Sequence, residues 1–195
     1  LCPVTEYNTN VFKNMVYYLG EQGKSLTVPE PGDKFSLGSA EIEILGPVKE
    51  YDGTNDTSIV LRIDYGETSF LFTGDMEKGA EADLIDSGAN LKADVLKAGH
   101  DGSDTSSSYQ FIREVMPDYV VISVGQDNSY GHPSNEVLSR YRDAGAEVYR
   151  TDMQGHVIAA SDGRTVTFRT EKEAATSTNP TGNSALQTYV GNAGT

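Results

Sequence analysis

Three short segments of the sequence end a hydrophobic run with a side chain that can bind a metal ion or move a proton. Asp75 closes the run FLFTGD at residues 70–75, and His100 follows the run LKAG at residues 96–99. His132 lies in the segment NSYGHP, shortly after the run YVVISV. Carboxylate and imidazole groups are ligands that Zn²⁺ and Mn²⁺ accept. The three residues are therefore candidates for one metal-dependent site.

The segments that must position these residues have the pattern of buried strands. Each is a short apolar run bounded by small or turn-forming residues. Strands are predicted at residues 68–73, 93–98 and 119–124, and helices at residues 77–85, 106–116 and 134–144. If the strands lie side by side, their ends bring Asp75, His100 and His132 to the same rim. The alternation of strands and helices predicts a layered α/β domain.

Each candidate also has a simpler interpretation. Asp75 follows a glycine, so it is expected either as a turn or helix-capping residue or as a metal ligand. His100 is either a surface-loop histidine or a ligand or acid–base group oriented by Asp101. His132 either merely precedes a helix or contacts a substrate phosphate at the start of that helix. His156 falls within a strand pattern and is predicted to be structural.

The remaining elements are predicted from the same patterns. They are a helix ending near residue 21, two hairpins at residues 34–45 and 58–73, and final strands at residues 147–150, 156–161 and 165–169. Tyr17, Tyr18 and Phe111 stand at helical spacing and are predicted to be core residues. Asp152 is predicted to be a turn residue, with contact to the site as the alternative.

The composition restricts the function of the chain. Its formal net charge is −14 and its pI is about 4.5, which argues against an autonomous basic nucleic-acid binder, because phosphate contacts need Lys and Arg. A nuclease stays compatible with this charge, because a bound metal supplies local positive charge. Cys2 is the one cysteine, so no disulfide forms within the chain. The apolar runs are too short to span a membrane.

The composition also suggests where domains end. Residues 1–170 are predicted to form one domain. Residues 171–186 are rich in Ala, Thr, Ser, Asn, Pro and Gly, which is typical of a linker. Residues 187–195 are expected to begin a further module or to form a disordered tail.

The order and spacing of the motifs resemble the metallo-β-lactamase-fold domain of the ComEC/Rec2 competence proteins and their secreted Gram-positive relatives. The motifs that carry the resemblance are NDTS, FLFTGD, LKAGHDGS, ISVG followed by YGHP, and TD with a later Gly. The resemblance covers about residues 1–169. It implies an αββα sandwich, a site for one or two divalent ions (Zn²⁺ or Mn²⁺) at one rim, and an extracellular or cell-surface location.

The resemblance also implies roles for individual residues. Asp75, His100 and His132 correspond to metal ligands, and together with Asp101 they form the expected catalytic set. Asp101 stands where the family has a second histidine, which would move metal preference from Zn²⁺ toward Mn²⁺ or Mg²⁺.

A second departure concerns the family's first metal motif, His-x-His-x-Asp-His. With only three histidines, the chain does not contain it. The motif is expected upstream of Leu1, which would make this chain the second half of the domain, with an incomplete metal site. A half-sandwich would expose an apolar sheet face. We therefore expect a missing partner segment, self-association or marginal stability.

Two functions follow from the sequence. The first is a metal-dependent hydrolase, a phosphodiesterase or nuclease linked to DNA uptake or degradation, with nucleic acid or another phosphodiester as substrate. The alternative is a catalytically degenerate or truncated surface binding module without metal. Asp101 and the absent first motif favour the alternative.

Overall fold

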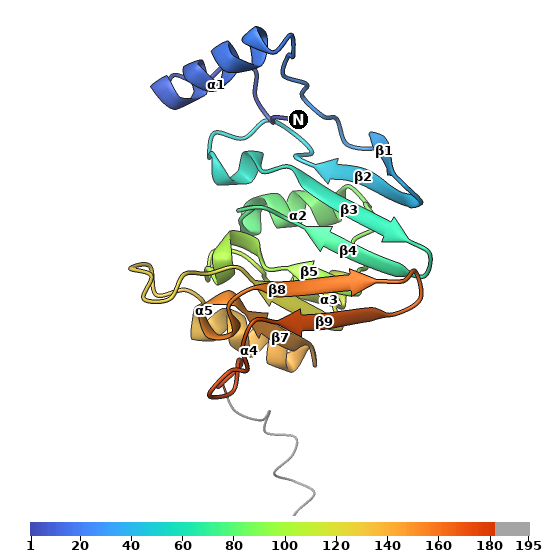
Figure 1. Cartoon of the computed structure of the whole chain (residues 1–195), viewed down its shortest axis with the longest axis vertical. Coiled ribbons are helices and arrows are strands. Elements are labelled where there is room, and N and C mark those ends of the chain that lie inside the picture. The colour runs from blue at the N-terminus through green and yellow to red at the C-terminus, as the bar shows by residue number, and fades with distance from the viewer. Residues whose placement is uncertain (182–195) are drawn as a thin grey trace, which may run out of the picture.

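The computed structural model describes residues 1–181 and shows a seven-stranded sheet whose strands lie side by side in chain order (Figure 1). The strands are β1 (Lys34–Leu37), β2 (Ala40–Gly46), β3 (Val60–Tyr65), β4 (Thr68–Phe72), β5 (Val95–Lys97), β6 (Tyr119–Ile122) and β7 (Glu147–Arg150). Strands β1 to β4 pair antiparallel, and β4 to β7 pair parallel. The sheet is therefore a meander joined to a parallel half, and the predicted α/β class is confirmed.

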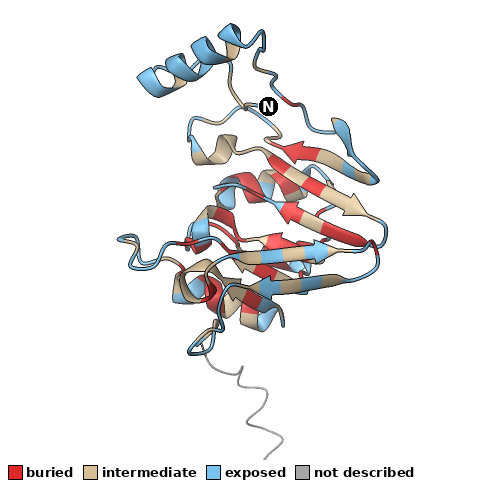
Figure 2. Cartoon of the chain, viewed as in Figure 1, coloured by how far each residue is buried: buried red, intermediate tan, exposed pale blue. Residues whose placement is uncertain are grey.

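Helices α2 (Lys78–Asp86), α3 (Tyr109–Val115) and α4 (Asn135–Asp143) connect the parallel strands. An apolar row runs across β4 to β7, and each member pairs in register with the next. The row consists of Leu71, Leu96, Val120 and Val148. All four are buried in one core with Leu84, Phe111 and Leu138 of the three helices (Figure 2). The helices thus cover one face of the parallel half and hold its strand ends in place.

The other face is covered over its parallel half by a hairpin of β8 (Val157–Ser161) and β9 (Val166–Thr170). Phe168 of β9 stacks on Tyr149 at a ring-centroid distance of 4.1 Å and lies 4.8 Å from Tyr119. In Figure 1 this hairpin crosses in front of the main sheet, opposite the helices. The helices, the seven-stranded sheet and the β8–β9 hairpin form three stacked layers, which is consistent with a metallo-β-lactamase-like fold.

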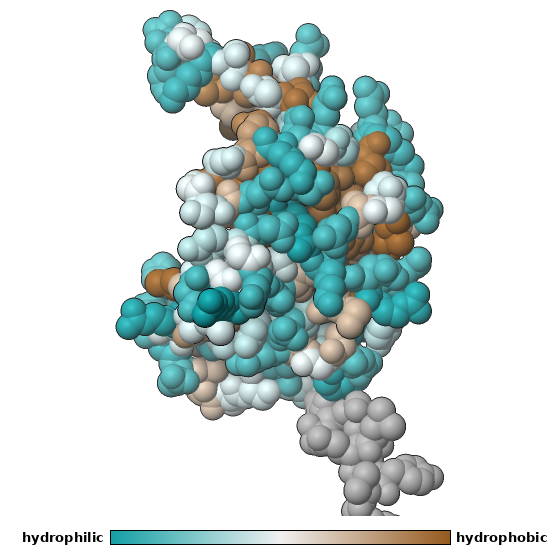
Figure 3. All heavy atoms as spheres, turned by 90° about the vertical axis from the view of Figure 1, so that its right-hand side faces the viewer, coloured by the Kyte–Doolittle hydropathy of each residue, from teal (hydrophilic) through white to brown (hydrophobic). Residues whose placement is uncertain are grey.

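The antiparallel half of that second face is more open. Phe35, Ile42, Ile63 and Phe70 pair in register and therefore share this face. Phe35 is 39% exposed, and the other three are partly exposed. Figure 3 shows apolar surface gathered at the level of these strands. Within residues 1–181, the expected open apolar face is thus restricted to β1–β4.

Helix α1 (Asn10–Glu21) stands away from the sheet (Figure 1). The Thr9 hydroxyl accepts a hydrogen bond from the backbone N–H of Phe12, as expected for a helix cap. No residue of the helix is buried, and Tyr17 and Tyr18 are 61% and 63% exposed. The prediction that these tyrosines are core residues is wrong, because helical spacing defines a face without showing what packs against it. The same prediction for Phe111 is confirmed by its 1% exposure.

Residues 171–181 contain no helix or strand, but their backbone contacts the domain. The guanidinium groups of Arg142 and Arg150 donate to the carbonyls of Thr181 and Thr178, at 2.6 and 3.3 Å. The division at residue 170 stays a prediction, and the further module at residues 187–195 lies outside the described residues. No helix in the described part is long and apolar enough to cross a membrane.

Candidate functional site

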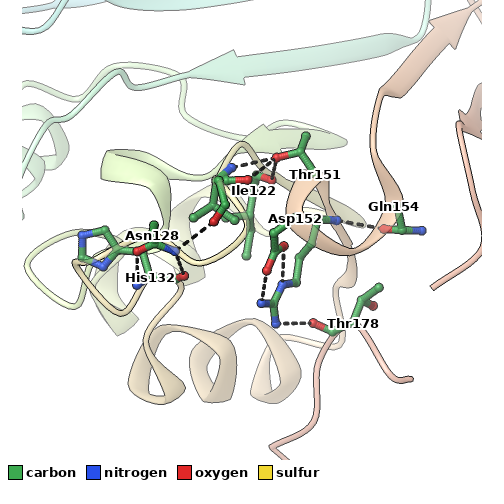
Figure 4. Close-up of polar contacts among 10 residues, drawn as sticks. Ile122, Asn128, His132, Thr151, Asp152, Gln154 and Thr178 are labelled. Carbon is green, nitrogen blue, oxygen red and sulfur yellow. Dashed lines mark hydrogen bonds and ion pairs between the residues drawn. The ribbon is translucent and has the colours of Figure 1, made fainter. Parts of the chain in front are cut away.

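The segments that follow β4, β5, β6 and β7 meet at one edge of the sheet, because the carboxyl ends of parallel strands point the same way. The loops after β4, β5 and β6 carry Asp75, His100 and His132, and β7 continues directly into helix α5 (Thr151–Gln154). Three hydrogen bonds tie the loops together. His100 N donates to Gly74 O (3.0 Å), Ser134 N to Gly102 O (2.9 Å), and Val124 N to Thr151 Oγ1 (2.8 Å, Figure 4).

The loop after β5 has a strained backbone. His100 and Asp101 have φ values of 47° and 52°, in the left-handed region. This region costs an L-residue about 1–2 kcal/mol. The next residue, Gly102, packs so closely on the loop after β6 that a Cβ atom there would lie 2.6 Å from Pro133 Cβ. Strained residues of this kind concentrate at functional sites.

The two candidate histidines of the rim face each other. The ring centroids of His100 and His132 are 5.8 Å apart, with an interplanar angle of 64°. The Asn128 side chain accepts from His132 N (3.0 Å) and donates to His132 O (2.7 Å), which fixes this loop (Figure 4). His132 Nδ1 is buried and has no hydrogen-bond partner among the described residues. A buried polar atom in this state needs a water, ion or substrate group as its partner.

The ring of His100 contacts two further polar side chains. Its Nδ1 lies 3.5 Å from Glu77 Oε1 and 3.4 Å from Thr105 Oγ1. The Thr105 distance is at the long end of hydrogen bonding, and the Glu77 distance lies within ion-pair range. The His100 side chain is 29% exposed. One side of the imidazole is therefore held by the protein while the residue stays accessible.

Lys97, the last residue of β5, adds an ammonium group to the rim. Its Nζ donates to Ala98 O at 2.7 Å and lies 3.6 Å from Asp101 Oδ1. Burial lowers the pKa of Lys97 below its ordinary value of 10.5, and the carboxylates of Asp101 and Asp75 oppose that shift. The ammonium group thus lies in the field of both carboxylates.

Asp75 is exposed, and its backbone is held by Ser58, the residue that follows the 3₁₀ turn at Asn55–Thr57. Asp75 N donates to Ser58 Oγ at 2.9 Å. Helix α2 has Glu77 as its N-cap residue, and Asp56 Oδ1 accepts from the Glu77 N–H at 2.9 Å. Asp75 therefore does not cap the helix, so the capping interpretation is wrong, whereas the prediction that it lies in a turn is confirmed.

A buried clamp fixes the segment that follows His100. The carboxylate of Glu81, 2% exposed, accepts the backbone N–H groups of Ser107 and Ser108. The Arg140 guanidinium donates to Ser106 O (2.9 Å) and Ser107 O (3.0 Å). Burial raises the pKa of Glu81, and these N–H groups and Arg140 oppose the shift.

The two other titratable candidates have partners of their own. Asp152 lies in the first turn of helix α5, so the prediction of a turn residue is wrong, and it forms an ion pair with Arg150 at 2.6 Å (Figure 4). His156 precedes β8, its side chain is 91% exposed, and its nearest acidic group is Glu171 at 3.8 Å.

Comparison with known proteins identifies the family. A family model described as "Metallo-beta-lactamase superfamily" matches residues 5–126, more than half of the chain. The chain belongs to the metallo-beta-lactamase superfamily. Among curated proteins it is 34% identical over 149 residues to "ComE operon protein 3" of Bacillus subtilis, covering 76% of this chain and 19% of that protein. It is 43% identical over 124 residues to "Competence protein ComA" of Neisseria gonorrhoeae, covering 63% of this chain and 18% of that protein.

A further relative is "Recombination protein 2" of Haemophilus influenzae, 37% identical over 103 residues, covering 53% of this chain and 13% of that protein. The predicted resemblance to competence proteins of the ComEC/Rec2 type is confirmed. The chain spans about a fifth or less of the length of these relatives.

The superfamily usually binds divalent metals. Residues 1–181 contain no group of three or more His, Cys, Asp or Glu side chains placed to hold a metal ion. The structure brings His100 and His132 together but does not complete a metal centre with Asp75. We therefore assign no catalytic step to a metal, and the three ligand assignments stay predictions.

Sequence reasoning missed two polar side chains of this rim, Lys97 and Glu77. A signal for Lys97 exists, because a charged residue inside the apolar run VLKA is unusual in a buried strand. Glu77 has no comparable signal, because its contact with His100 depends on how the start of α2 meets the loop after β5.

Proposed function

We propose that this chain is part of a metal-dependent hydrolase that cleaves phosphodiester bonds, a nuclease acting in DNA uptake or degradation. The observation that carries the proposal is the pair of facing imidazoles, His100 and His132, at the carboxyl edge of the parallel strands. Membership in the metallo-beta-lactamase superfamily and the similarity to competence proteins support it. The chain spans only a fraction of the length of those relatives, so their activity is proposed for this chain and not established.

The chain's own residues match the proton transfers of this reaction. Hydrolysis of a phosphodiester removes a proton from the attacking water and delivers one to the leaving oxygen. Two adjacent imidazoles can perform these transfers, each by general acid–base catalysis. In the proposed site, His100 and His132 hold these protons, Asp101 assists, and Lys97 attracts a phosphate oxygen.

Divalent metal, as one or two ions of Zn²⁺ or Mn²⁺, stays part of the proposal. Asp75, His100 and His132 are the proposed contributors, and further ligands from outside the described residues would be needed. A histidine nitrogen that binds the metal cannot carry a proton, so in the metal-bound site the acid–base role falls to His132 or Asp101, with His100 as ligand. An extracellular or cell-surface location is proposed with the same function.

A binding module without metal is the second candidate. Two observations favour it: the described residues complete no metal centre, and Asp101 already has Lys97 at 3.6 Å. Under this proposal the rim binds a partner and performs no chemistry.

The test compares His100→Ala with His156→Ala, which removes an equally sized ring from an exposed position. Cleavage of fluorescent single-stranded DNA is followed with added Mn²⁺ or Zn²⁺ and with chelator. We expect His100→Ala to lose about 100-fold or more of the rate, as is typical for loss of an acid–base group, and His156→Ala to keep it. Full activity of His100→Ala would refute the assignment. A wild-type protein that retains no metal and cleaves no phosphodiester would favour the binding module.

A further inference from the structure

The orientation of His100 is set by a small polar network around its Nδ1 atom. Glu77 Oε1 lies 3.5 Å from this nitrogen, and Thr105 Oγ1 lies 3.4 Å from it. Glu77 precedes α2 and Thr105 follows the His100 loop, so the imidazole contacts residues of two separate segments. Among residues 1–181, the opposite nitrogen, Nε2, has no hydrogen bond to the protein.

The donors and acceptors of this network determine which nitrogen of the neutral His100 ring carries the hydrogen. The Glu77 carboxylate can only accept, and Thr105 Oγ1 can donate its single hydrogen to Glu77 Oε1 at 3.1 Å or to Ser103 Oγ at 3.0 Å. With the hydrogen on either of these partners, Thr105 Oγ1 presents a lone pair to His100. Both atoms that face His100 Nδ1 therefore act as acceptors. The neutral ring satisfies them only when the hydrogen is on Nδ1, which leaves Nε2 with a free lone pair.

The carboxylate of Glu77 is held before any ligand arrives. Asn55 Nδ2 donates to Glu77 Oε1 at 3.1 Å, and the Glu77 N–H donates to Asp56 Oδ1 at 2.9 Å. Lys78 N donates to Thr105 O at 2.9 Å, which binds the two segments to each other. Supporting contacts of this kind keep a functional side chain in its productive geometry.

We propose that Glu77 is a positioning residue that holds His100 in the tautomer with hydrogen on Nδ1, so that Nε2 is free to accept a proton or bind a cation. The usefulness of this arrangement rests on the proposed function. The tautomer itself does not, because it follows from the network around Nδ1.

The experiment reads the tautomer directly. A proton–nitrogen correlation spectrum of histidine-labelled protein, recorded at mildly alkaline pH, distinguishes a protonated from an unprotonated Nε2. The three histidine signals are assigned by single substitutions. For the wild-type chain we expect His100 to show hydrogen on Nδ1 and none on Nε2. A wild-type His100 with hydrogen on Nε2 would overturn the proposal without any variant.

Variants then test the role of Glu77. Glu77→Gln keeps the size of the side chain but can turn an NH₂ group toward the ring, so we expect a large population of the other tautomer. Thr105→Val removes the second acceptor and should shift the population the same way. Glu136→Gln, at an exposed position in the first turn of α4, is the matched control and should leave the spectrum unchanged. An unchanged His100 signal in Glu77→Gln would overturn the proposal.

The two proposals fail separately. If the wild-type protein cleaves no DNA but shows the Nδ1 tautomer and its loss in Glu77→Gln, the proposed function is wrong and the role of Glu77 stands. If DNA is cleaved while Glu77→Gln keeps the wild-type tautomer, the positioning role is wrong and the proposed function stands.

Discussion

The contact between the loops of His100 and His132 can be tested by adding a single methyl group. Gly102 has a φ of 85°, and a Cβ atom there would lie 2.6 Å from Pro133 Cβ and 3.1 Å from Pro133 Cα. Gly102→Ala therefore has two costs. The left-handed backbone costs about 1–2 kcal/mol, and overpacking against the rigid proline ring adds about 1–3 kcal/mol. The expected loss in free energy of unfolding is about 2–5 kcal/mol.

A matched control separates the two costs. Gly145 follows α4 with a φ of 78°, and a Cβ atom there would meet nothing within 4 Å. Gly145→Ala should show the backbone cost alone, about 1–2 kcal/mol. Urea unfolding of both variants measures the difference. In addition, Gly102→Ala should weaken magnetization transfer between the His100 and His132 rings. Equal losses for the two variants would show that the two loops do not pack as described.

Two further predictions concern the buried clamp and the open sheet face. Burial raises the folded-state pKa of Glu81 above its ordinary value of 4.5, so the folded state binds more protons than the unfolded state between pH 4.5 and the raised pKa. The free energy of unfolding of the wild-type chain, relative to that of Glu81→Gln, should therefore fall as pH rises from 4.5 through the raised pKa. Urea unfolding at several pH values measures this difference, and a difference that stays constant with pH would contradict the prediction. On the open face, Phe35→Asp should reduce binding of an apolar dye and any concentration-dependent association in size-exclusion chromatography, while Tyr130→Asp on the exposed loop before His132 should not. A wild-type monomer that binds no dye at any concentration would count against an exposed apolar face.

Local patterns were sufficient to predict the parallel half of the sheet. Runs such as LFT and VLKA form strands of the expected type, and the helices between them follow from apolar spacing. Because parallel strands end at one edge, the proximity of His100 and His132 could also be predicted. These inferences need only periodicity and the geometry of strand–helix–strand units.

Other features depend on contacts between distant segments and could not be predicted. Tyr17 and Tyr18 have helical spacing, yet their helix has no buried residue. The hairpin β8–β9 covers the parallel half through Phe168, and its sequence does not specify that destination. Glu77 contacts His100 because Asn55 and Asp56 fix the start of α2.

The charges around the rim separate the two proposed functions. The rim carries three carboxylates, of which Glu77 lies beside His100 and Asp101 and Asp75 act on Lys97, the one ammonium group named there, on a chain of net charge −14. A phosphodiester approaching this rim is repelled unless a cation compensates the carboxylates. Hydrolysis of DNA therefore requires a bound cation in addition to Lys97. A binding module without metal would instead favour a cationic or neutral partner. The hydrolase therefore needs to bind an anionic substrate together with a cation, whereas the binding module needs a partner that is not anionic.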